Sequence, residues 1–396
     1  MKRSLSLTTL FLPWLLLAGM ARGDAGLDSL QVHGFLSQGF VKTDHNRFFG
    51  PSDEGSFQFT EIGINGSIRP TSSLLLSAQL LARKAGAMYD LRPTLDFAQL
   101  RWEILERDRF DLGVSIGRVK NPIGLYNVTR DVAHTRPSVF LPQAIYYDKV
   151  RNLQHSSDGV LLHASHFSDV GEFALDLGLG QPILDSNVER VVLGRDWAGK
   201  LRSERPGRRM QLRFSTPDAG WRLALSYADL DLRFRPGTGD LPGPGRTKIR
   251  FIVASAEYNA ADWAFTAEYL HEPVKLSGYG AAFDTETASK AWYLQGRYFV
   301  TPRLSLHLRY EQACQSRDDC DGRDAAARSG FTLPASLFYA KAWTLGLRWE
   351  PSERVLLGAD LTLNHGNYFL SSADNPDPSR LRTDWKMLSL LAAYRF

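Results

Sequence analysis

The chain has 396 residues, is rich in glycine and aromatic residues, and carries charged side chains dispersed along its length. Its formal net charge of +4 falls by three, to +1, if Lys2, Arg3 and Arg22 leave with an N-terminal leader, which gives no case for nucleic-acid binding. Beyond the N-terminus no stretch is apolar over the roughly 20 residues that a membrane-spanning helix needs, so a bundle of such helices is excluded.

The N-terminus has the pattern of a secretory signal peptide. Two basic residues precede an apolar run at Leu10–Leu17, and small residues flank a cleavage site after Gly23. We therefore predict a cleaved signal peptide at residues 1–23 and a mature chain at 24–396, with cleavage after Ala25 as a second candidate. An uncleaved anchor is the alternative, but the apolar run falls well short of the length that crosses a bilayer.

The mature chain is predicted to form short strands, each with period-two alternation and bounded by turn residues. Each is close to the roughly 9–11 residues that cross a bilayer at a tilt. We expect any missed or split strand within Gln181–Pro206. The sixteen predicted strands are Val32–Val41, Ser56–Ile68, Ser73–Arg83, Thr94–Ile104, Phe110–Val119, Asp158–His166, Glu172–Gly180, Arg208–Ser215, Trp221–Asp231, Lys248–Asn259, Trp263–Glu272, Lys290–Val300, Leu304–Ala313, Tyr339–Glu350, Val355–His365 and Trp385–Phe396.

Every second connection is predicted to be a tight turn, and the connections between those turns are long and polar. Short periplasmic turns that alternate with long external loops are the layout of an outer-membrane barrel, and an even strand number places both chain ends on the periplasmic rim. The predicted fold class is therefore all-β, a transmembrane antiparallel β-barrel of sixteen strands. The tight turns are Arg69–Ser72, Leu105–Arg109, Ser168–Gly171, Thr216–Gly220, Ala260–Asp262, Thr301–Arg303 and Pro351–Glu353.

Several predicted strands have one apolar and one polar face. In Leu304–Glu311, three leucines and a tyrosine alternate with Ser, His, Arg and Glu. A charge that faces lipid at the bilayer midplane costs about 2–4 kcal/mol, so the apolar faces must point outwards and the polar faces must line a water-filled pore. Ordinary solvation or a salt bridge is the alternative role for each wall charge. The predicted wall residues are Arg83, Arg101, Arg209, Arg213, Arg297, Arg309, Arg348, Glu311 and Glu350.

The longest connection, Lys120–Ser157, is too apolar to remain in water, since it contains Ile123, Phe140 and Tyr146 among other large apolar residues. It is the third external loop in order, and we expect it to fold inward and narrow the pore. An external flap or an oligomer contact is the alternative. Its small excess of cations predicts a weak preference for anions. The predicted constriction residues are Lys120, Arg130, Asp131, Arg136, Asp148, Lys149 and Arg151.

The two cysteines, Cys314 and Cys320, lie six positions apart in a loop rich in Arg and Asp. In an exported protein this pattern predicts a disulfide that staples a loop tip. A metal site is the weaker interpretation, because no other Cys or His lies close by in the sequence. We therefore predict neither a metal nor a cofactor.

The strand Leu388–Phe396 alternates at period two and ends on an aromatic residue. We expect it to close the cylinder, and its terminal Phe396 resembles the signal that the barrel-assembly machinery reads. A soluble β-sandwich that happens to end on phenylalanine is the alternative.

Two further segments, AWYLQGRYFVTP at Ala291–Pro302 and GRVKNPIG at Gly117–Gly124, are similar to stretches of the phosphate-selective porin O/P-like family. The whole mature chain resembles a sixteen-stranded porin. This resemblance implies a trimeric, water-filled diffusion channel in the bacterial outer membrane, with outer-membrane lipid, lipopolysaccharide and the barrel-assembly machinery as partners. It does not carry over substrate residues, because those porins use dense ladders of Arg and Lys whereas here acidic residues interleave.

We therefore expect passive diffusion of small polar or anionic solutes, without catalysis. One alternative is a barrel lipase or protease, for which His155–Asp158 is the most suggestive cluster. Another is a non-conducting structural or adhesion barrel with a blocked interior.

Overall fold

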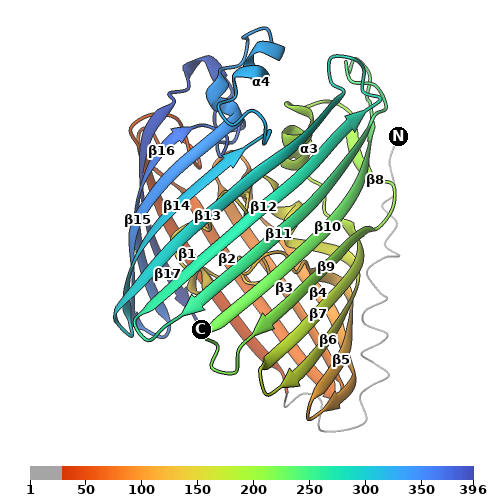
Figure 1. Cartoon of the computed structure of the whole chain (residues 1–396), viewed down its shortest axis with the longest axis vertical. Coiled ribbons are helices and arrows are strands. Elements are labelled where there is room, and N and C mark those ends of the chain that lie inside the picture. The colour runs from red at the N-terminus through yellow and green to blue at the C-terminus, as the bar shows by residue number, and fades with distance from the viewer. Residues whose placement is uncertain (1–28) are drawn as a thin grey trace, which may run out of the picture.

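The computed structural model describes residues 29–396, so the predicted signal peptide lies outside the described residues. The described chain forms one antiparallel sheet in which strands that follow one another pair and β1 pairs with β17, which closes the sheet into a barrel (Figure 1). Among seventeen strand segments, β8 and β9 both lie along β10 as two parts of one strand, which leaves sixteen barrel strands. The predicted fold class and strand number are confirmed.

The strand segments are β1 (Gln31–Thr43), β2 (Ser56–Thr71), β3 (Leu74–Ala85), β4 (Tyr89–Arg107), β5 (Phe110–Lys120), β6 (Ser156–Ser168), β7 (Gly171–Pro182), β8 (Lys200–Ser203), β9 (Gly207–Ser215), β10 (Trp221–Arg235), β11 (Arg246–Asn259), β12 (Trp263–Ser277), β13 (Thr285–Thr301), β14 (Leu304–Cys314), β15 (Tyr339–Ser352), β16 (Val355–Gly366) and β17 (Asp384–Arg395). The connections carry the helices α2 (Arg151–His155), α3 (Ser186–Leu193) and α4 (Arg323–Arg328), and the 3-10 turns η2 (Ala133–Thr135), η3 (Asp148–Val150), η4 (Ala335–Phe338) and η5 (Pro378–Arg380). None of the helices between residues 29 and 396 is long and apolar enough to cross a membrane.

The break between β8 and β9 lies within Gln181–Pro206, the stretch in which the sequence predicts a missed or split strand. Pro206 has no backbone N–H and so cannot donate to the ladder on β10, where pairing resumes with Arg208 opposite Asp229. The apolar residues just before the break belong to α3, which starts where the Asp185 carboxylate accepts a hydrogen bond from the N–H of Val188 (2.9 Å).

The two faces of the strands separate as their alternation predicts. On β14, Leu306 and Leu308 are exposed, whereas His307 and Arg309 are at most 3% exposed. On β15, Trp343, Leu345, Leu347 and Trp349 are exposed in the same way, while the residues between them are directed to the interior. The barrel therefore has an apolar outer surface and a polar inner wall.

One rim carries the tight turns and the two ends of the described barrel. Gly34 of β1 and Phe396 exchange two backbone hydrogen bonds of 3.0 and 3.1 Å, so the last strand closes the cylinder beside the first. The opposite rim carries the long connections. There, Cys314 at the end of β14 forms a disulfide with Cys320 in the β14–β15 connection, which also holds α4 (Figure 1).

The β3–β4 connection differs from the prediction of a long loop. Both strands extend beyond their predicted ends and leave only Gly86–Met88 between them. Gly86 has a left-handed φ of +56°, and a Cβ there would lie 2.5 Å from the Asp374 carboxylate. The turn is therefore tight because the β16–β17 connection packs directly on it.

Candidate functional site

The connection between β5 and β6, which we call the 121–155 segment, packs against the barrel wall. The ring of Phe140 contacts those of Phe48, Phe49 and Phe59 at centroid distances of 5.0–5.3 Å. Most of its large apolar residues are buried, and only Val128 among them is exposed to a large extent. The buried set, each member at most 5% exposed, comprises Ile123, Val139, Phe140, Leu141, Ile145, Tyr146, Tyr147, Val150 and Leu153.

The backbone of the 121–155 segment is held by side chains from strands spaced around the barrel. These partners are Ser226 on β10, Glu268 on β12, Glu311 on β14 and Asp360 on β16. The hydrogen bonds run from the N–H groups of Gly124 to Ser226 (3.0 Å), Leu125 to Glu268 (3.0 Å), Val139 to Asp360 (3.0 Å) and Ala144 to Glu311 (2.9 Å). Three acidic residues of the inner wall therefore hold the segment in place instead of facing solvent.

A first buried charge cluster joins the segment to β2 and β3. Glu61 of β2 pairs with Arg83 of β3 (3.0 Å) and with Arg136 of the segment (2.5 Å). Arg83 also pairs with Asp148 (2.6 Å), which lies 3.8 Å from the Arg130 guanidinium. Because all five side chains are almost fully buried, each ion pair is shielded from competing water.

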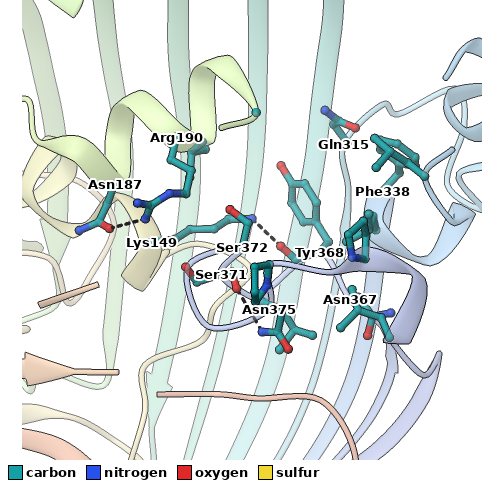
Figure 2. A pocket seen from close by; sticks show the side chains of 18 residues that line it. Lys149, Asn187, Arg190, Gln315, Phe338, Asn367, Tyr368, Ser371, Ser372 and Asn375 are labelled. Carbon is teal, nitrogen blue, oxygen red and sulfur yellow. Dashed lines mark hydrogen bonds between the residues drawn. The ribbon is translucent and has the colours of Figure 1, made fainter. Parts of the chain in front are cut away.

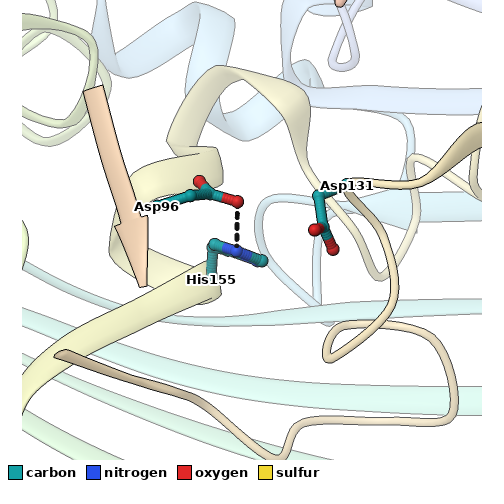
Figure 3. A group of neighbouring side chains, drawn as sticks. All are labelled: Asp96, Asp131 and His155. Atoms are coloured by element: carbon teal, nitrogen blue, oxygen red, sulfur yellow. Dashed lines mark ion pairs between the residues drawn. The ribbon is translucent and has the colours of Figure 1, made fainter. Parts of the chain in front are cut away.

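A second buried cluster lies beside β4 (Figure 3). Asp96 accepts two hydrogen bonds from Arg151 (3.0 and 3.1 Å) and lies 2.9 Å from the His155 ring. Both oxygens of Asp131 accept from the Lys120 ammonium, at 3.0 and 3.1 Å. Burial raises the pKa of Asp131, but Lys120, His155 and the Gln79 amide together outweigh burial and hold that pKa below the usual value.

The second cluster also has the composition of a metal site. Asp96, Asp131 and His155 offer ligand atoms that lie within 4.8 Å of one another. However, Arg151 and Lys120 already match the two carboxylate charges at hydrogen-bond distance. A divalent cation would have to approach these two buried cations, so the arrangement favours ion pairing over metal ligation.

The predicted wall residues fall into groups with different partners. Arg309 and Arg348 donate to segment backbone carbonyls, the first to Phe140 (3.3 Å) and the second to His134 and Arg136 (both 2.6 Å). Arg348 also pairs along the wall with Glu350, as Arg101 does with Glu103 and Arg213 with Asp176. Within residues 29–396, neither Arg209 nor Arg297 has a carboxylate at ion-pair distance: Arg209 donates to the Gly180 carbonyl, and Arg297 lies over the Phe299 ring.

An open cavity of about 300 Å³ remains between the segment and the tight-turn rim. Four arginines line it against one acidic residue, Glu350. The arginines are Arg136, Arg297, Arg303 and Arg348. Since Arg136 is paired with Glu61 and Arg348 with Glu350, the excess positive charge of this open space comes from Arg297 and Arg303.

Lys149 is the one predicted constriction residue that lies elsewhere. It points to the long-loop mouth, where its ammonium donates to the Tyr368 carbonyl and lies 4.3 Å from the centroid of the Tyr368 ring. The other six meet in the two buried clusters.

The interior also contains a serine–histidine–aspartate arrangement. The Ser115 hydroxyl lies 3.2 Å from Nε2 of His163, and Nδ1 of His163 contacts Asp176. These side chains come from the adjacent strands β5, β6 and β7. Ser115 is completely buried, so its hydroxyl is not placed to meet a substrate.

The His155–Asp158 cluster singled out in the sequence does not form such a relay. The Ser157 hydroxyl donates to Asn121, and Asp158 pairs with Arg118 (2.7 Å). His155 instead lies beside Asp96.

Sequence patterns missed Asp96, which is central to the second cluster. The register skips it, because Gln79 pairs with Phe97 and Leu80 with Leu95, which makes Asp96 the extra residue of a β-bulge. A bulge shifts the alternation by one position, so a strict period-two assignment beyond it puts residues on the wrong face. No local sequence signal marks this bulge.

No protein-family model and no curated protein sequence matches the chain. Its structure is similar to that of outer-membrane-expressed OmpT of Vibrio cholerae, with 13% identity, a TM-score of 0.56, and coverage of 95% of this chain and 99% of that one. It is also similar to the outer membrane channel DcaP of Acinetobacter baumannii (10% identity, TM-score 0.56, coverage 93% and 97%). A third similar structure is an anion-selective porin from Comamonas acidovorans (11% identity, TM-score 0.57, coverage 93% and 99%).

The chain has the fold of an outer-membrane barrel. At such low identity the likeness concerns the architecture, and it covers nearly the whole length of each chain. What passes through this barrel, or reacts in it, has to be argued from its own residues.

Proposed function

We propose that the protein is a porin of the bacterial outer membrane, a water-filled channel for passive diffusion of small polar or anionic solutes. The closed sixteen-stranded barrel with an apolar outer surface suits the lipid environment of that membrane. Two of the similar structures are described as a channel and as an anion-selective porin, which supports this function.

The observation that carries the preference for anions is the cationic cavity near the tight-turn rim. Four arginines line about 300 Å³ of open space, and two of them, Arg136 and Arg348, are paired with Glu61 and Glu350. The other two, Arg297 and Arg303, have no acidic partner among residues 29–396. A pore lined mainly by Arg favours anions. The resemblance to phosphate-selective porins also favours a preference for anions. Because acidic residues occur throughout the inner wall, we propose a general anion preference rather than selectivity for phosphate.

The 121–155 segment is the proposed constriction. Its backbone reaches side chains of β10, β12, β14 and β16 across the interior, so solutes must pass beside it. We further propose a homotrimer in contact with outer-membrane lipid and lipopolysaccharide, inserted by the barrel-assembly machinery. Light scattering of the detergent-solubilised protein tests the trimer.

Reversal potentials in a salt gradient across a planar bilayer test the channel and its selectivity together. The wild-type protein should carry a steady ohmic current with an anion preference, and the double variant Arg297→Ala, Arg303→Ala should shift the anion/cation permeability ratio toward cations. Arg354→Ala is the matched control, because Arg354 is an exposed arginine of a neighbouring tight turn outside the cavity. Absence of ohmic current would disprove the channel, and an unchanged ratio would remove the cavity from the ion path.

A serine hydrolase is the second candidate function, because the His163 ring lies between the Ser115 hydroxyl and the Asp176 carboxylate, as in a catalytic triad. We propose that the arrangement is structural, since Ser115 is fully buried on the inner wall. A fluorophosphonate probe should leave the folded wild-type protein unlabelled. Labelling that disappears in Ser115→Ala would show that the barrel is an enzyme.

A further inference from the structure

Four long connections meet at the mouth of the barrel and enclose a pocket of about 380 Å³ (Figure 2). Lys149 reaches it from the 121–155 segment, and Arg190 from α3. Gln315 belongs to the β14–β15 connection, and Tyr368 and Ser372 to the β16–β17 connection. The volume lies in the range of roughly 300–1,000 Å³ that is typical of small-ligand sites.

The charged side chains of this pocket are all cations. Lys149 and Arg190 line it, and no carboxylate does. Arg190 is already paired with Asp196 (2.7 Å), whereas within residues 29–396 no carboxylate lies within ion-pairing distance of Lys149. The Lys149 ammonium donates to the carbonyl of Tyr368 and lies over its ring.

The environment of Lys149 shows that its charge is poorly compensated. Burial lowers its pKa to about 8, and Glu272 is the acid that acts in the opposite direction. A mostly buried ammonium with neutral partners gains more from a bound anion than an exposed lysine does, because its water shell is already lost.

The rest of the lining is divided between apolar and hydrogen-bonding groups. The side-chain amide of Gln315 and the hydroxyl of Ser372 have no hydrogen-bond partner among residues 29–396, so both are free to bind a ligand. The apolar part consists of Val191, Leu333, Leu337, Phe338, Leu370, Pro376, Pro378 and Leu381. An inorganic anion would gain nothing from this apolar surface, whereas the hydrocarbon part of an organic acid would be buried against it.

We propose that this pocket binds a small organic solute with one carboxylate, held by Lys149, and an apolar body that rests against the leucines and Phe338. The site lies at the mouth of the proposed channel, so its role as a capture site for passing solutes rests on the proposed function. Binding itself does not depend on conduction and is measured separately.

Isothermal titration of the detergent-solubilised barrel tests the site. The probe is 3-phenylpropanoate, the neutral match is 3-phenylpropanamide, and inorganic phosphate represents an anion without an apolar body. We expect the carboxylate to bind at least about tenfold more tightly than the amide and than phosphate, since both charge and apolar contact contribute.

Two variants separate the charge from the cavity. Lys149→Met keeps the length of the side chain and should weaken carboxylate binding at least about tenfold. Leu337→Trp should fill the apolar part and abolish binding with Lys149 in place. Lys341→Met is the matched control, because Lys341 is exposed near the same rim and lies outside the pocket.

The pH dependence gives a second readout. Tyr147 and Glu272 lie on the inner side of Lys149, Tyr368 contacts it, and Arg190 faces it from α3. Since the carboxylate of the probe is ionised above about pH 6, its affinity should be constant between about pH 6 and pH 7 and fall as the pH rises through about 8 and Lys149 loses its proton. Lys149→Met should show no such fall.

The outcomes distinguish the pocket from the channel. Carboxylate binding without ohmic current in bilayers would support the ligand pocket and disprove the channel. Ohmic current without carboxylate binding would support the channel and disprove the ligand pocket. The proposal is overturned if the amide or phosphate binds as tightly as the carboxylate. It is also overturned if Lys149→Met and Leu337→Trp, both folded, keep the wild-type affinity within about twofold.

Discussion

At the residue scale, the arginines expected to line a constriction serve mainly as attachments. Arg130, Arg136 and Arg151 are each at most 5% exposed, and each lies beside a carboxylate. Removing all three would release the 121–155 segment as well as change the charge of the pore. Selectivity is therefore better probed at Arg297 and Arg303, which have no ion-pair partner among residues 29–396 and line open space.

Arg136→Ala should destabilise the protein by about 3–5 kcal/mol, because it breaks a buried ion pair and leaves one oxygen of Glu61 without its charged partner. It also removes the hydrogen bond to the Arg130 carbonyl (2.8 Å). Denaturant unfolding of the detergent-solubilised barrel measures the loss. Arg101→Ala is the control: its guanidinium is 37% exposed and pairs along the wall, so it should cost less than about 1 kcal/mol. Equal losses would contradict the role of Arg136 as an anchor.

The attachment of the segment should resist moderate acid. Burial opposes ionisation of Asp148, but Arg83 and Arg130 hold its pKa below the usual 3.8. A carboxyl whose pKa is lowered on folding contributes its full stabilisation above pH 3.8 and loses it as the pH falls through the lower folded value. Open-channel current noise should therefore be the same at pH 7 and pH 5 and rise only below about pH 4. A rise between pH 7 and pH 5 would mean that another group controls the segment.

At the scale of elements, the β3–β4 turn depends on a glycine with two constraints. Gly86 has a left-handed φ, and a side chain there would collide with Asp374. Gly194 also has a left-handed φ, of +79°, but nothing lies within 4 Å of the point that a Cβ would occupy, so it isolates the backbone effect. Gly86→Ala should cost more stability than Gly194→Ala, by about 1–3 kcal/mol, in unfolding experiments. Equal losses of stability in the two variants would show that the β16–β17 connection can move aside to make room for the added side chain.

Strand alternation was enough to predict the barrel, because a sheet with lipid on one face must keep period two over its whole length. It failed where tertiary contacts override local pattern. The β3–β4 connection is short because another loop packs on it, and Asp96 turns inward because of a bulge that only strand pairing reveals. The apolar residues at Val191–Leu193 belong to α3, where an Asp185 cap favours a helix.

At the scale of the whole molecule, the 121–155 segment should limit the current. Replacing residues 133–145 with a short Gly/Ser linker removes the contacts of Val139, Phe140 and Ala144 with the wall, so single-channel conductance should rise. The strand ladder is untouched, and the barrel should still fold. Deleting residues 323–331, which include α4 at the outer rim, is the control and should leave conductance unchanged. A conductance that does not rise on loss of residues 133–145 would place the narrowest point elsewhere.

The candidate site was only partly predictable from the sequence. Composition showed that the 121–155 segment needs a surface to bury against. Six of the seven predicted constriction residues lie in the two buried clusters and Lys149 lies at the mouth, while their role in a constriction stays a prediction. Their pairing was not visible, because the partners Glu61, Asp96 and Arg83 come from strands far away in the chain. The mouth pocket was missed for the same reason, since four separate loops build it.

The wall contacts of the 121–155 segment also set an order of events during biogenesis. The segment is synthesised directly after β5, when Glu61 of β2 is already present. Glu268, Glu311 and Asp360, which hold its backbone, arrive only with β12, β14 and β16. Until those strands are in place, the N–H groups of Leu125, Val139 and Ala144 lack their carboxylate partners on the wall. An unfinished cylinder would thus differ from a finished one by an incompletely anchored interior, and the ordering of this segment would report that β16, the last strand to supply one of these anchors, has been added.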